Sequence, residues 1–290
     1  MTLADLIPLG ITTSIVLLVV GIGLHARPRD AISLLRQPGL LLRSLLSMTI
    51  IMPLVAAGLV LAFKLPSEVN VALVALAVSP VPPLLPKKER KAVGDVSYGI
   101  GLSVTVAVLA VVTVPLTASW LGSAFDRSGD VAAMTVAKLV LTTVLLPLAF
   151  GMAMQRWAPG LASKVARPLA VVGLVLLVAS ALPLLFALWP AVKAMFSEAA
   201  GMAISTMAVV GLAVGHLLGG PNADDRTVLA LSTTSRHPAV ALAVTAAAGV
   251  PTQPALAAIL LYVTVAFLVS MPYLAWRHRA SMREAPAAQA

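Results

Sequence analysis

Apolar runs long enough to cross a lipid bilayer recur along the whole chain. A helix crosses the hydrocarbon core with about 20 consecutive apolar residues. Runs of about that length lie near residues 6–24, 40–63, 69–95, 96–121, 131–154, 168–189, 200–218, 227–250 and 254–276. Because lipid offers the backbone no hydrogen-bond partners, each run must be a helix or a strand of a closed barrel. We therefore expect about nine membrane-spanning segments.

Composition indicates that these segments are helices. The chain has 60% apolar and only 11% charged residues, whereas soluble domains carry about 25% charged residues. Aromatic residues make up 4%, and the abundance of Ala, Leu and Val suits closely packed helices rather than barrel strands. The absence of cysteine excludes disulfides, thiolate metal sites and cysteine nucleophiles. We predict an all-α polytopic protein of the inner (plasma) membrane.

Basic residues gather at alternate ends of the apolar runs. The loops after the first, fifth and seventh runs, together with a tail at 277–290, hold Arg27, Arg29, Arg36, Arg156, Lys164, Arg167, Arg226, Arg277, Arg279 and Arg283. The intervening loops hold Lys64, Arg127 and Lys193. The positive-inside rule then predicts an amino terminus outside and a carboxyl-terminal tail in the cytoplasm. This distribution accounts for the net charge of +9 without nucleic acid as a partner.

The third run is interrupted by prolines and charges. From Ser79 to Asp95 it reads SPVPPLLPKKERKAVGD. Each proline inside a helix costs about 3 kcal/mol, and a charge at mid-bilayer costs about 2.5 kcal/mol or more. The stretch must therefore be a break, a loop or a site. One alternative is an ordinary cytoplasmic loop after a short helix that ends near Pro83.

The eighth run is interrupted in a similar way. Its middle, Leu231 to Pro238, reads LSTTSRHP. The third and eighth runs cross in opposite directions, and each is followed by one intact run. Paired broken helices of opposite direction are typical of inverted repeats in secondary transporters. The first half, with four runs, is one helix shorter than the second half.

The breaks are expected to expose polar backbone. Proline has no amide hydrogen and leaves the carbonyl four residues earlier without a helical donor. The oxygens concerned are those of Leu76, Val78, Ser79, Pro82 and Thr234. Such oxygens must be buried in protein or line a wet cavity. There, carbonyls can bind a cation, and half-helix amino termini with Arg or Lys can attract an anion.

Plainer interpretations compete with a site at these breaks. Arg236 is a structural residue if carbonyls, Glu89 or Asp95 satisfy it. For His237 the plainer interpretation is a hydrogen-bonded packing residue rather than a metal ligand, because no second His, Asp or Glu lies at metal-binding spacing. The small-residue stripe in the seventh run, formed by Gly211, Gly215 and Gly219, is explained by helix packing.

Four stretches resemble the bile acid:sodium symporter family. They are VLLVVGIGLHARPRD from Val16, RQPGLLLRSLLSMTIIMPLVA from Arg36, GDVSYGIGLSVTVAVLAVVTVPL from Gly94 and TTSRHPAVALAV from Thr233. The resemblance implies two inverted repeats in a chain that lacks the first helix of the ten-span form. It also implies a mobile panel (about 6–24 and 131–189). It further implies a core (about 38–121 and 197–276) in which two broken helices cross.

The chain departs from that family at the residues expected to bind sodium. By resemblance, sodium-binding positions correspond to Leu85, Pro86, Ser232, Arg236 and Met48, and none of these has the usual ligand side chain. Of two hydroxyl ligands in the following helix, one corresponds to Gly99 and the other is kept as Ser103. An arginine near the site would also repel sodium. Sodium coupling therefore does not follow from the resemblance.

These observations predict a secondary transporter that moves a small organic anion by alternating access. The anion class is bile-acid, keto-acid, pantoate or sulfonate-like. Arg236 is the expected anion ligand, because a guanidinium binds carboxylates and sulfonates bidentately. The other candidate substrate-binding residues are His237, Ser232, Thr233, Thr234, Ser235, Pro80, Pro82 and Pro83. Glu89, Asp95, Lys88, Lys91 and Ser103 are candidates for binding a coupling ion or proton.

Other functions remain open at the level of sequence. One alternative is a sodium-coupled anion symporter that binds sodium through backbone carbonyls, and another is a channel or a transport-inactive sensor. An enzyme is not expected, because the chain has no HExxH, no GxSxG and no paired intramembrane aspartates. No cofactor is predicted beyond sodium or a proton as the coupling ion. The expected partners are the lipid bilayer and the anion.

Overall fold

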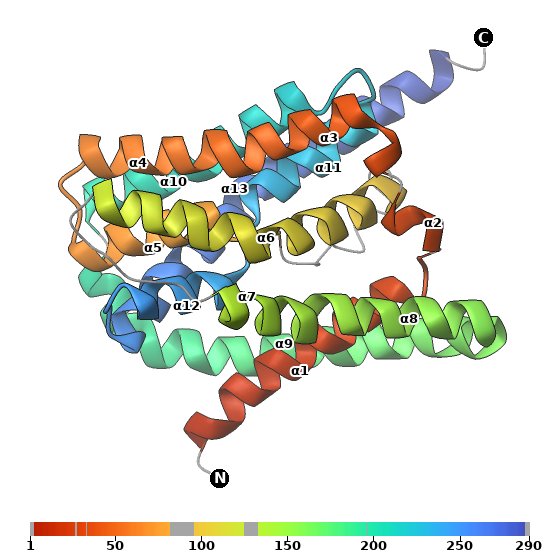
Figure 1. Ribbon diagram of the computed structural model, residues 1–290, viewed down its shortest axis with the longest axis horizontal. Coiled ribbons are helices and arrows are strands. Elements are labelled where there is room, and N and C mark those ends of the chain that lie inside the picture. The colour runs from red at the N-terminus through yellow and green to blue at the C-terminus, as the bar shows by residue number, and fades with distance from the viewer. Residues whose placement is uncertain are drawn as a thin grey trace.

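The fold is all-helical throughout the part of the chain that the structure describes (Figure 1). A computed structural model describes residues 3–26, 28–32, 34–81, 96–124, 133–195 and 197–287. Within these ranges, six helices are long and apolar enough to cross a membrane, and the shorter helices at Leu9–Gly23 and Ser67–Val78 are also apolar. The predicted all-α polytopic architecture is confirmed.

The elements follow one another in the order that the apolar runs predict. Their bounds are α1 (Leu3–Gly23), α2 (Pro28–Ala31), η1 (Leu34–Arg36), α3 (Pro38–Leu45), η2 (Leu46–Ile51), α4 (Met52–Ala62), α5 (Ser67–Val78), α6 (Val96–Ala124), α7 (Ala133–Val140), η3 (Leu141–Leu145), α8 (Leu146–Trp157), α9 (Pro159–Met195), α10 (Glu198–Leu218), α11 (Ala223–Thr234), α12 (Pro238–Ala247) and α13 (Thr252–Ala287). The segments α3–η2–α4 and α7–η3–α8 are each one continuous span.

Two helices extend beyond the apolar runs that predict them. Lys164 and Arg167, expected in a loop, lie inside α9, because only Ala158 separates α8 from α9. Arg277, expected in the tail, lies inside α13 and is only 5% exposed. The apolar run marks the part of a helix that lies in lipid, whereas the helix itself continues for as long as its backbone hydrogen bonds can form. Hydropathy therefore underestimated these lengths.

Two spans contain a short π-helix. These segments, η2 and η3, lie shortly before Pro53 and Pro147, which occupy the first turn of α4 and α8. Proline cannot donate to the carbonyl four residues earlier, so the ladder of hydrogen bonds shifts there. In η2 the wider turn carries Ser47 and Met48 on the buried side of the span. Ser47 is therefore fully buried.

The helix α1 packs against α8 and α9, and these lie together in the lower part of Figure 1. Val20 of α1 and Leu24, directly after it, share a buried cluster with Ala162 and Ala166 of α9. Glycine lets α1 and α8 approach closely, because a Cβ added to Gly23 would lie 2.5 Å from the Leu148 carbonyl oxygen. These helices therefore form one closely packed layer.

The remaining helices form a larger buried cluster, to which Leu188 and Val192 of α9 also belong. It includes Leu73 and Ala77 of α5, Val240 and Ala241 of α12, and Tyr262 of α13. Both short half-helices, α5 and α12, are thus enclosed by protein rather than by lipid. Burial of this kind is what broken helices in a bilayer require.

The predicted packing role of the glycine stripe in α10 is confirmed. A Cβ added to Gly215 would lie 2.5 Å from the Cα of Ala230 in α11, and a Cβ on Gly211 would lie 3.0 Å from the Thr234 hydroxyl. Gly219 faces the backbone of Arg226 in the same way. The stripe therefore brings the backbones of α10 and α11 into contact.

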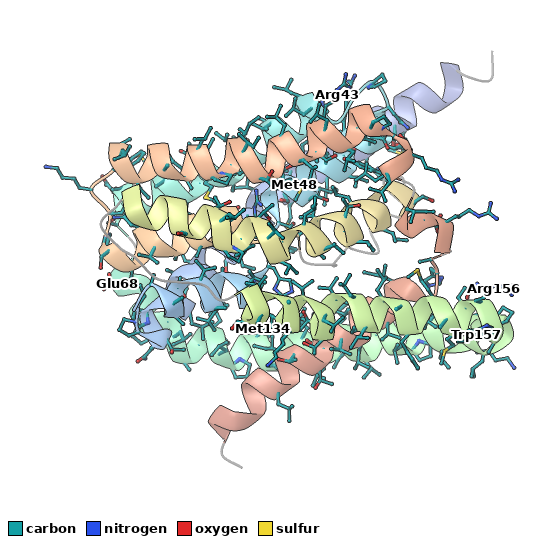
Figure 2. All side chains as sticks on the ribbon, viewed as in Figure 1. Arg43, Met48, Glu68, Met134, Arg156 and Trp157 are labelled. Atoms are coloured by element: carbon teal, nitrogen blue, oxygen red, sulfur yellow. The ribbon has the colours of Figure 1, made fainter. Side chains whose placement is uncertain are left out.

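Charged residues distinguish the two ends of the helical bundle. Figure 2 shows Arg43 and Arg156 toward one end, and Glu68 toward the other. The first end also carries the connection between α8 and α9. This asymmetry agrees with the alternation of basic loops in the sequence.

Candidate functional site at the helix crossing

The first break follows α5. The helix ends at Val78, and Ser79 has extended backbone angles of φ −70° and ψ 144°. Pro80 and Pro83 deprive the carbonyls of Leu76 and Ser79 of helical donors, so the local sequence ends the helix here. The Ser79 hydroxyl donates back to the Ala75 carbonyl at 2.7 Å, which helps to close the last turn.

The second break separates α11 from α12. Ser235 is extended at φ −78° and ψ 133°, and so is His237 at φ −78° and ψ 106°. Pro238 begins α12, a position that proline favours, and it forces the residue before it out of helical geometry. The local sequence therefore specifies the position of this break as well.

The two breaks are hydrogen-bonded to each other. The His237 amide donates to the Pro80 carbonyl at 2.9 Å. Nη1 of Arg236 donates to the Ser79 carbonyl at 3.1 Å, across 157 residues of sequence. The two breaks therefore meet and are joined by hydrogen bonds, in agreement with the pairing expected from the two interrupted runs.

Several carbonyls that the sequence predicts to be unpaired have donors in the structure. The Leu76 carbonyl accepts from the Ser79 amide at 3.1 Å, and the Thr234 carbonyl accepts from the Tyr262 hydroxyl at 2.8 Å. Arg236 supplies the donor for Ser79. The expectation of unpaired oxygens was wrong for these three residues, because donors from a tight turn and from distant helices cannot be read from proline positions.

Within the described residues, Arg236 makes one hydrogen bond, from Nη1 to the Ser79 carbonyl, and the Tyr262 side chain lies close to its guanidinium. It is 3% exposed, and neither Nε nor Nη2 has a hydrogen-bond partner within the described residues. Nε and Nη2 form one edge of the planar guanidinium and point their hydrogens in the same direction. Such an edge can bind a carboxylate with two parallel hydrogen bonds. Arg236 is therefore positioned by Ser79, and among the described residues its Nε–Nη2 edge has no hydrogen-bond partner.

His237 is the next residue in the chain and is more buried than Arg236. It is 1% exposed, and in the described structure neither ring nitrogen has a partner. A buried polar group without a partner costs about 1–3 kcal/mol. Two adjacent residues with unused hydrogen-bonding capacity indicate a place that a ligand can occupy. The described residues contain no group of three His, Cys, Asp or Glu side chains that could hold a metal ion.

The hydroxyl residues of the second break bind neighbouring helices. Thr233 Oγ1 lies 2.7 Å from Ser47 Oγ of η2, and Thr234 Oγ1 donates to the Ala208 carbonyl of α10 at 3.3 Å and to the Ala230 carbonyl of its own helix at 3.1 Å. Ser232 is buried as well. The hydroxyls of Thr233 and Thr234 thus fix the position of the break.

Other predicted residues have different surroundings. Ser103 donates to the Gly99 carbonyl of its own helix at 2.9 Å, and Met48 is buried in a cluster with Val81 and Tyr98. The following predicted positions lie outside the described residues: Pro82, Pro83, Leu85, Pro86, Lys88, Glu89, Lys91 and Asp95.

Sequence reasoning missed two residues that hold the crossing. Ser47 binds Thr233, and Tyr262 binds the carbonyl of Thr234. Ser47 is next to Met48, a position that the resemblance had indicated, so a search of that turn would have found it. Tyr262 had no comparable signal beyond being a polar aromatic residue in an apolar run.

A second polar cluster joins α11 to α13 away from the crossing. Arg277 donates from Nε to the Thr227 hydroxyl at 3.0 Å and from Nη2 to the Ala223 carbonyl at 3.1 Å. His216 Nδ1 and the Tyr273 hydroxyl are 2.9 Å apart. The two Arg277 bonds anchor the amino-terminal end of α11 and explain why Arg277 is buried, whereas the His216–Tyr273 bond joins α10 to α13.

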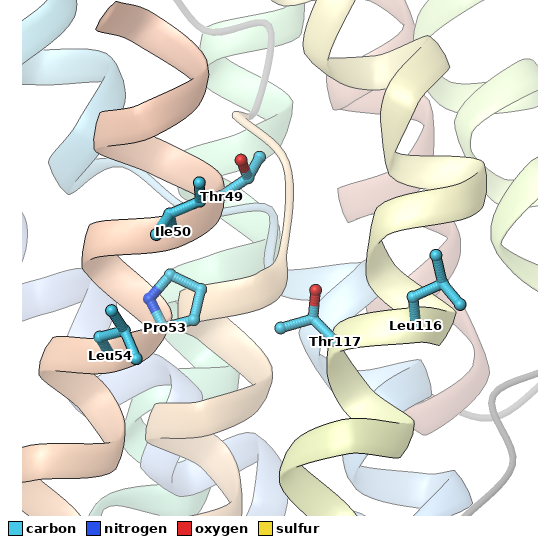
Figure 3. Close-up of a pocket in the computed structure, with 6 residues that line it drawn as sticks. All are labelled: Thr49, Ile50, Pro53, Leu54, Leu116 and Thr117. Atoms are coloured by element: carbon cyan, nitrogen blue, oxygen red, sulfur yellow. The ribbon is translucent and has the colours of Figure 1, made fainter.

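A surface groove lies between α3–η2–α4 and α6 (Figure 3). Its volume is about 290 Å³, and it is lined by Thr49, Ile50, Pro53, Leu54, Leu116 and Thr117. Both threonine hydroxyls donate to carbonyls of their own helices at 2.7 Å. The groove is therefore apolar, and its lining does not include Arg236 or His237.

Comparison with known families agrees with the fold and the crossing. The model of the sodium bile acid symporter family matches residues 12–189, which is more than half of the chain. The chain belongs to the sodium bile acid symporter family. Membership makes it an integral membrane protein of a transporter family. This agrees with the expectation of a transporter rather than an enzyme. The match includes the first break, whereas the second break lies beyond it and is defined by the structure. A comparison with curated proteins found no match.

Proposed function

We propose that this protein is a secondary transporter that moves a small organic anion across the inner membrane by alternating access. Membership of the symporter family supports transport of an organic anion. The observation that carries the proposal is the Nε–Nη2 edge of Arg236, which is buried at the meeting point of two broken helices and has no hydrogen-bond partner among the described residues.

The chemistry of this edge favours a carboxylate or a sulfonate. A guanidinium binds both groups bidentately and keeps its charge at any physiological pH. The amino terminus of α12 begins at Pro238, directly after His237, and carries a partial positive charge. Substrates of the keto-acid, pantoate, sulfonate or bile-acid type therefore suit the site, with His237 as a second polar contact.

The proposed movement is between two groups of helices. The panel consists of α1, α7–η3–α8 and α9, and the core contains α3 to α6 and α10 to α13. The close packing of α1 with α8 and α9 supports movement of the panel as a unit. The crossing belongs to the core, so alternating access would expose Arg236 first to one side of the membrane and then to the other.

Sodium coupling through backbone carbonyls is the alternative mechanism. It receives less support, because the carbonyls of Leu76, Ser79 and Thr234 already accept hydrogen bonds. Proton coupling through Glu89 or Asp95 remains a prediction from the sequence.

Anion transport is tested by counterflow in proteoliposomes with a panel of carboxylates and sulfonates. We expect saturable counterflow of at least one anion, which a channel or a sensor would not give. Arg236→Lys keeps the charge but loses the bidentate edge, so its Kd for that anion should rise about tenfold or more, equivalent to about 1.4 kcal/mol.

The matched control is Arg156→Lys, which changes an exposed arginine at the end of α8. Its Kd should equal that of the unaltered protein. An Arg236→Lys variant with unchanged affinity would exclude bidentate recognition by Arg236. Absence of counterflow for every anion tested would exclude the proposed carrier function.

A further inference from the structure

The carboxyl-terminal ends of two half-helices meet at the crossing. α5 ends at Val78 and α11 ends at Thr234, and the residues that follow each end are hydrogen-bonded to each other. The carboxyl terminus of a helix carries a partial charge of about −0.5. Two such ends in a buried place create a site that favours a positive charge.

The guanidinium of Arg236 occupies this negative region. Its Nη1 donates to the Ser79 carbonyl at 3.1 Å. No helical amide can serve that oxygen, because residue 83 is proline. The side chain is 3% exposed, so water screens its charge very little. A permanent cation of the protein is thus bound to a carbonyl that the helix break has released.

We infer that Arg236 acts as a fixed internal cation at the crossing, in place of a bound inorganic cation. It neutralises the two helix ends and occupies an oxygen that a sodium or potassium ion would need. Its charge also repels a second cation over a few ångströms. The structure of the crossing should therefore be independent of alkali cations. The consequence for transport, that substrate binding needs no sodium, rests on the function proposed above.

The test measures thermal stability of the purified protein in lipid nanodiscs. Sodium chloride is replaced by choline chloride at constant ionic strength, and the Tm of the unaltered protein should not change. Arg236→Gln retains a polar side chain but removes the charge and Nη1. We expect its Tm in choline chloride to fall by several degrees, and sodium to restore part of that loss in a saturable manner.

Arg277→Gln is the matched control. Arg277 is equally buried and also donates to a backbone carbonyl, but that carbonyl belongs to the amino-terminal end of α11. The variant should lose stability without gaining a response to sodium, because a helix amino terminus does not attract cations.

Two results would overturn the inference. One is a saturable rise in the Tm of the unaltered protein with sodium, and the other is an Arg236→Gln variant that is as stable as the unaltered protein in choline chloride. If Arg236→Gln does not fold, Arg236→Lys, which keeps the charge, should be purified and remain insensitive to sodium. A sodium response of Arg236→Lys would also overturn the inference.

The same assay with organic anions separates this inference from the proposed function. A protein that responds to neither sodium nor any anion contradicts the proposed anion site and leaves the fixed cation supported. A protein that binds its anion only in sodium contradicts the fixed cation and leaves anion transport supported.

Discussion

At the scale of single residues, the crossing depends on side chains that reach backbone or hydroxyl groups far away in the sequence. Arg236 reaches Ser79, Tyr262 reaches Thr234, and Ser47 reaches Thr233. In a low-dielectric interior, each of these bonds satisfies polar groups that would otherwise be buried without a partner. The crossing is therefore a network of polar contacts inside an apolar bundle.

The Ser47–Thr233 bond gives a prediction at this scale. Ser47→Ala and Thr233→Val should each lower stability, and a double-mutant cycle should give a coupling energy of about 0.6 kcal/mol and at most about 1.7 kcal/mol, the range found for hydrogen bonds between membrane helices. Unfolding in a denaturing detergent titration measures these energies.

The control pairs Thr233→Val with Ser270→Ala. Ser270 donates to the Ala266 carbonyl of its own helix at 2.7 Å. That pair should show additive effects. Additive effects for Ser47 and Thr233 as well would mean that the two hydroxyls contribute no mutual stabilisation.

At the scale of helices, close backbone approach and proline breaks decide how the elements fit. Proline in the first turn of α4 and α8 accompanies the π-helices η2 and η3, and proline after α5 and α11 accompanies the two breaks. Glycine decides the spacing of α10 and α11. Single proline and glycine residues thus decide where the helices are interrupted and how closely they pack.

Gly215 gives a prediction at this scale. Gly215→Ala places a Cβ 2.5 Å from the Cα of Ala230, so α10 and α11 must move apart. We expect a loss of about 1–3 kcal/mol, the usual cost of overpacking. The midpoint of thermal unfolding measures it.

Gly58→Ala is the matched control for that substitution. Gly58 lies in α4, and a Cβ there would meet nothing within 4 Å. Alanine in an open helical position should stabilise by about 0.5–1 kcal/mol. If Gly215→Ala also proved stabilising, the close contact between α10 and α11 would be refuted.

At the scale of the whole molecule, charge asymmetry predicts how the protein lies in the membrane. The end with Arg43 and Arg156 is expected in the cytoplasm, and the end with Glu68 outside (Figure 2). Since the chain has no cysteine, single introduced cysteines report orientation without a background signal.

Lys64→Cys and Lys164→Cys test that orientation as a matched pair. Both lysines are exposed; Lys64 lies between α4 and α5, and Lys164 lies near the start of α9. With intact spheroplasts, a membrane-impermeant maleimide should label Lys64→Cys at once. It should label Lys164→Cys only after permeabilisation. The reverse pattern would place the amino terminus in the cytoplasm.

Much of this fold follows from patterns within single segments. Nine apolar runs predicted the order of the spans, and Pro80, Pro83 and Pro238 predicted where two of them break. Arg236 and His237 were marked as site candidates because charged and polar residues in a membrane run are costly. These predictions succeeded because proline geometry and burial cost act over a few residues.

The sequence by itself thus determined which segments lie in lipid and where the helices are interrupted. Only the tertiary structure decided which freed carbonyls obtain donors, and which nitrogens of Arg236 find partners among the described residues. Those outcomes depend on residues such as Ser79 and Tyr262, which lie up to 157 positions away along the chain. Hydrogen bonding across that distance requires the three-dimensional approach of helices, and that approach is set by the packing of the whole molecule.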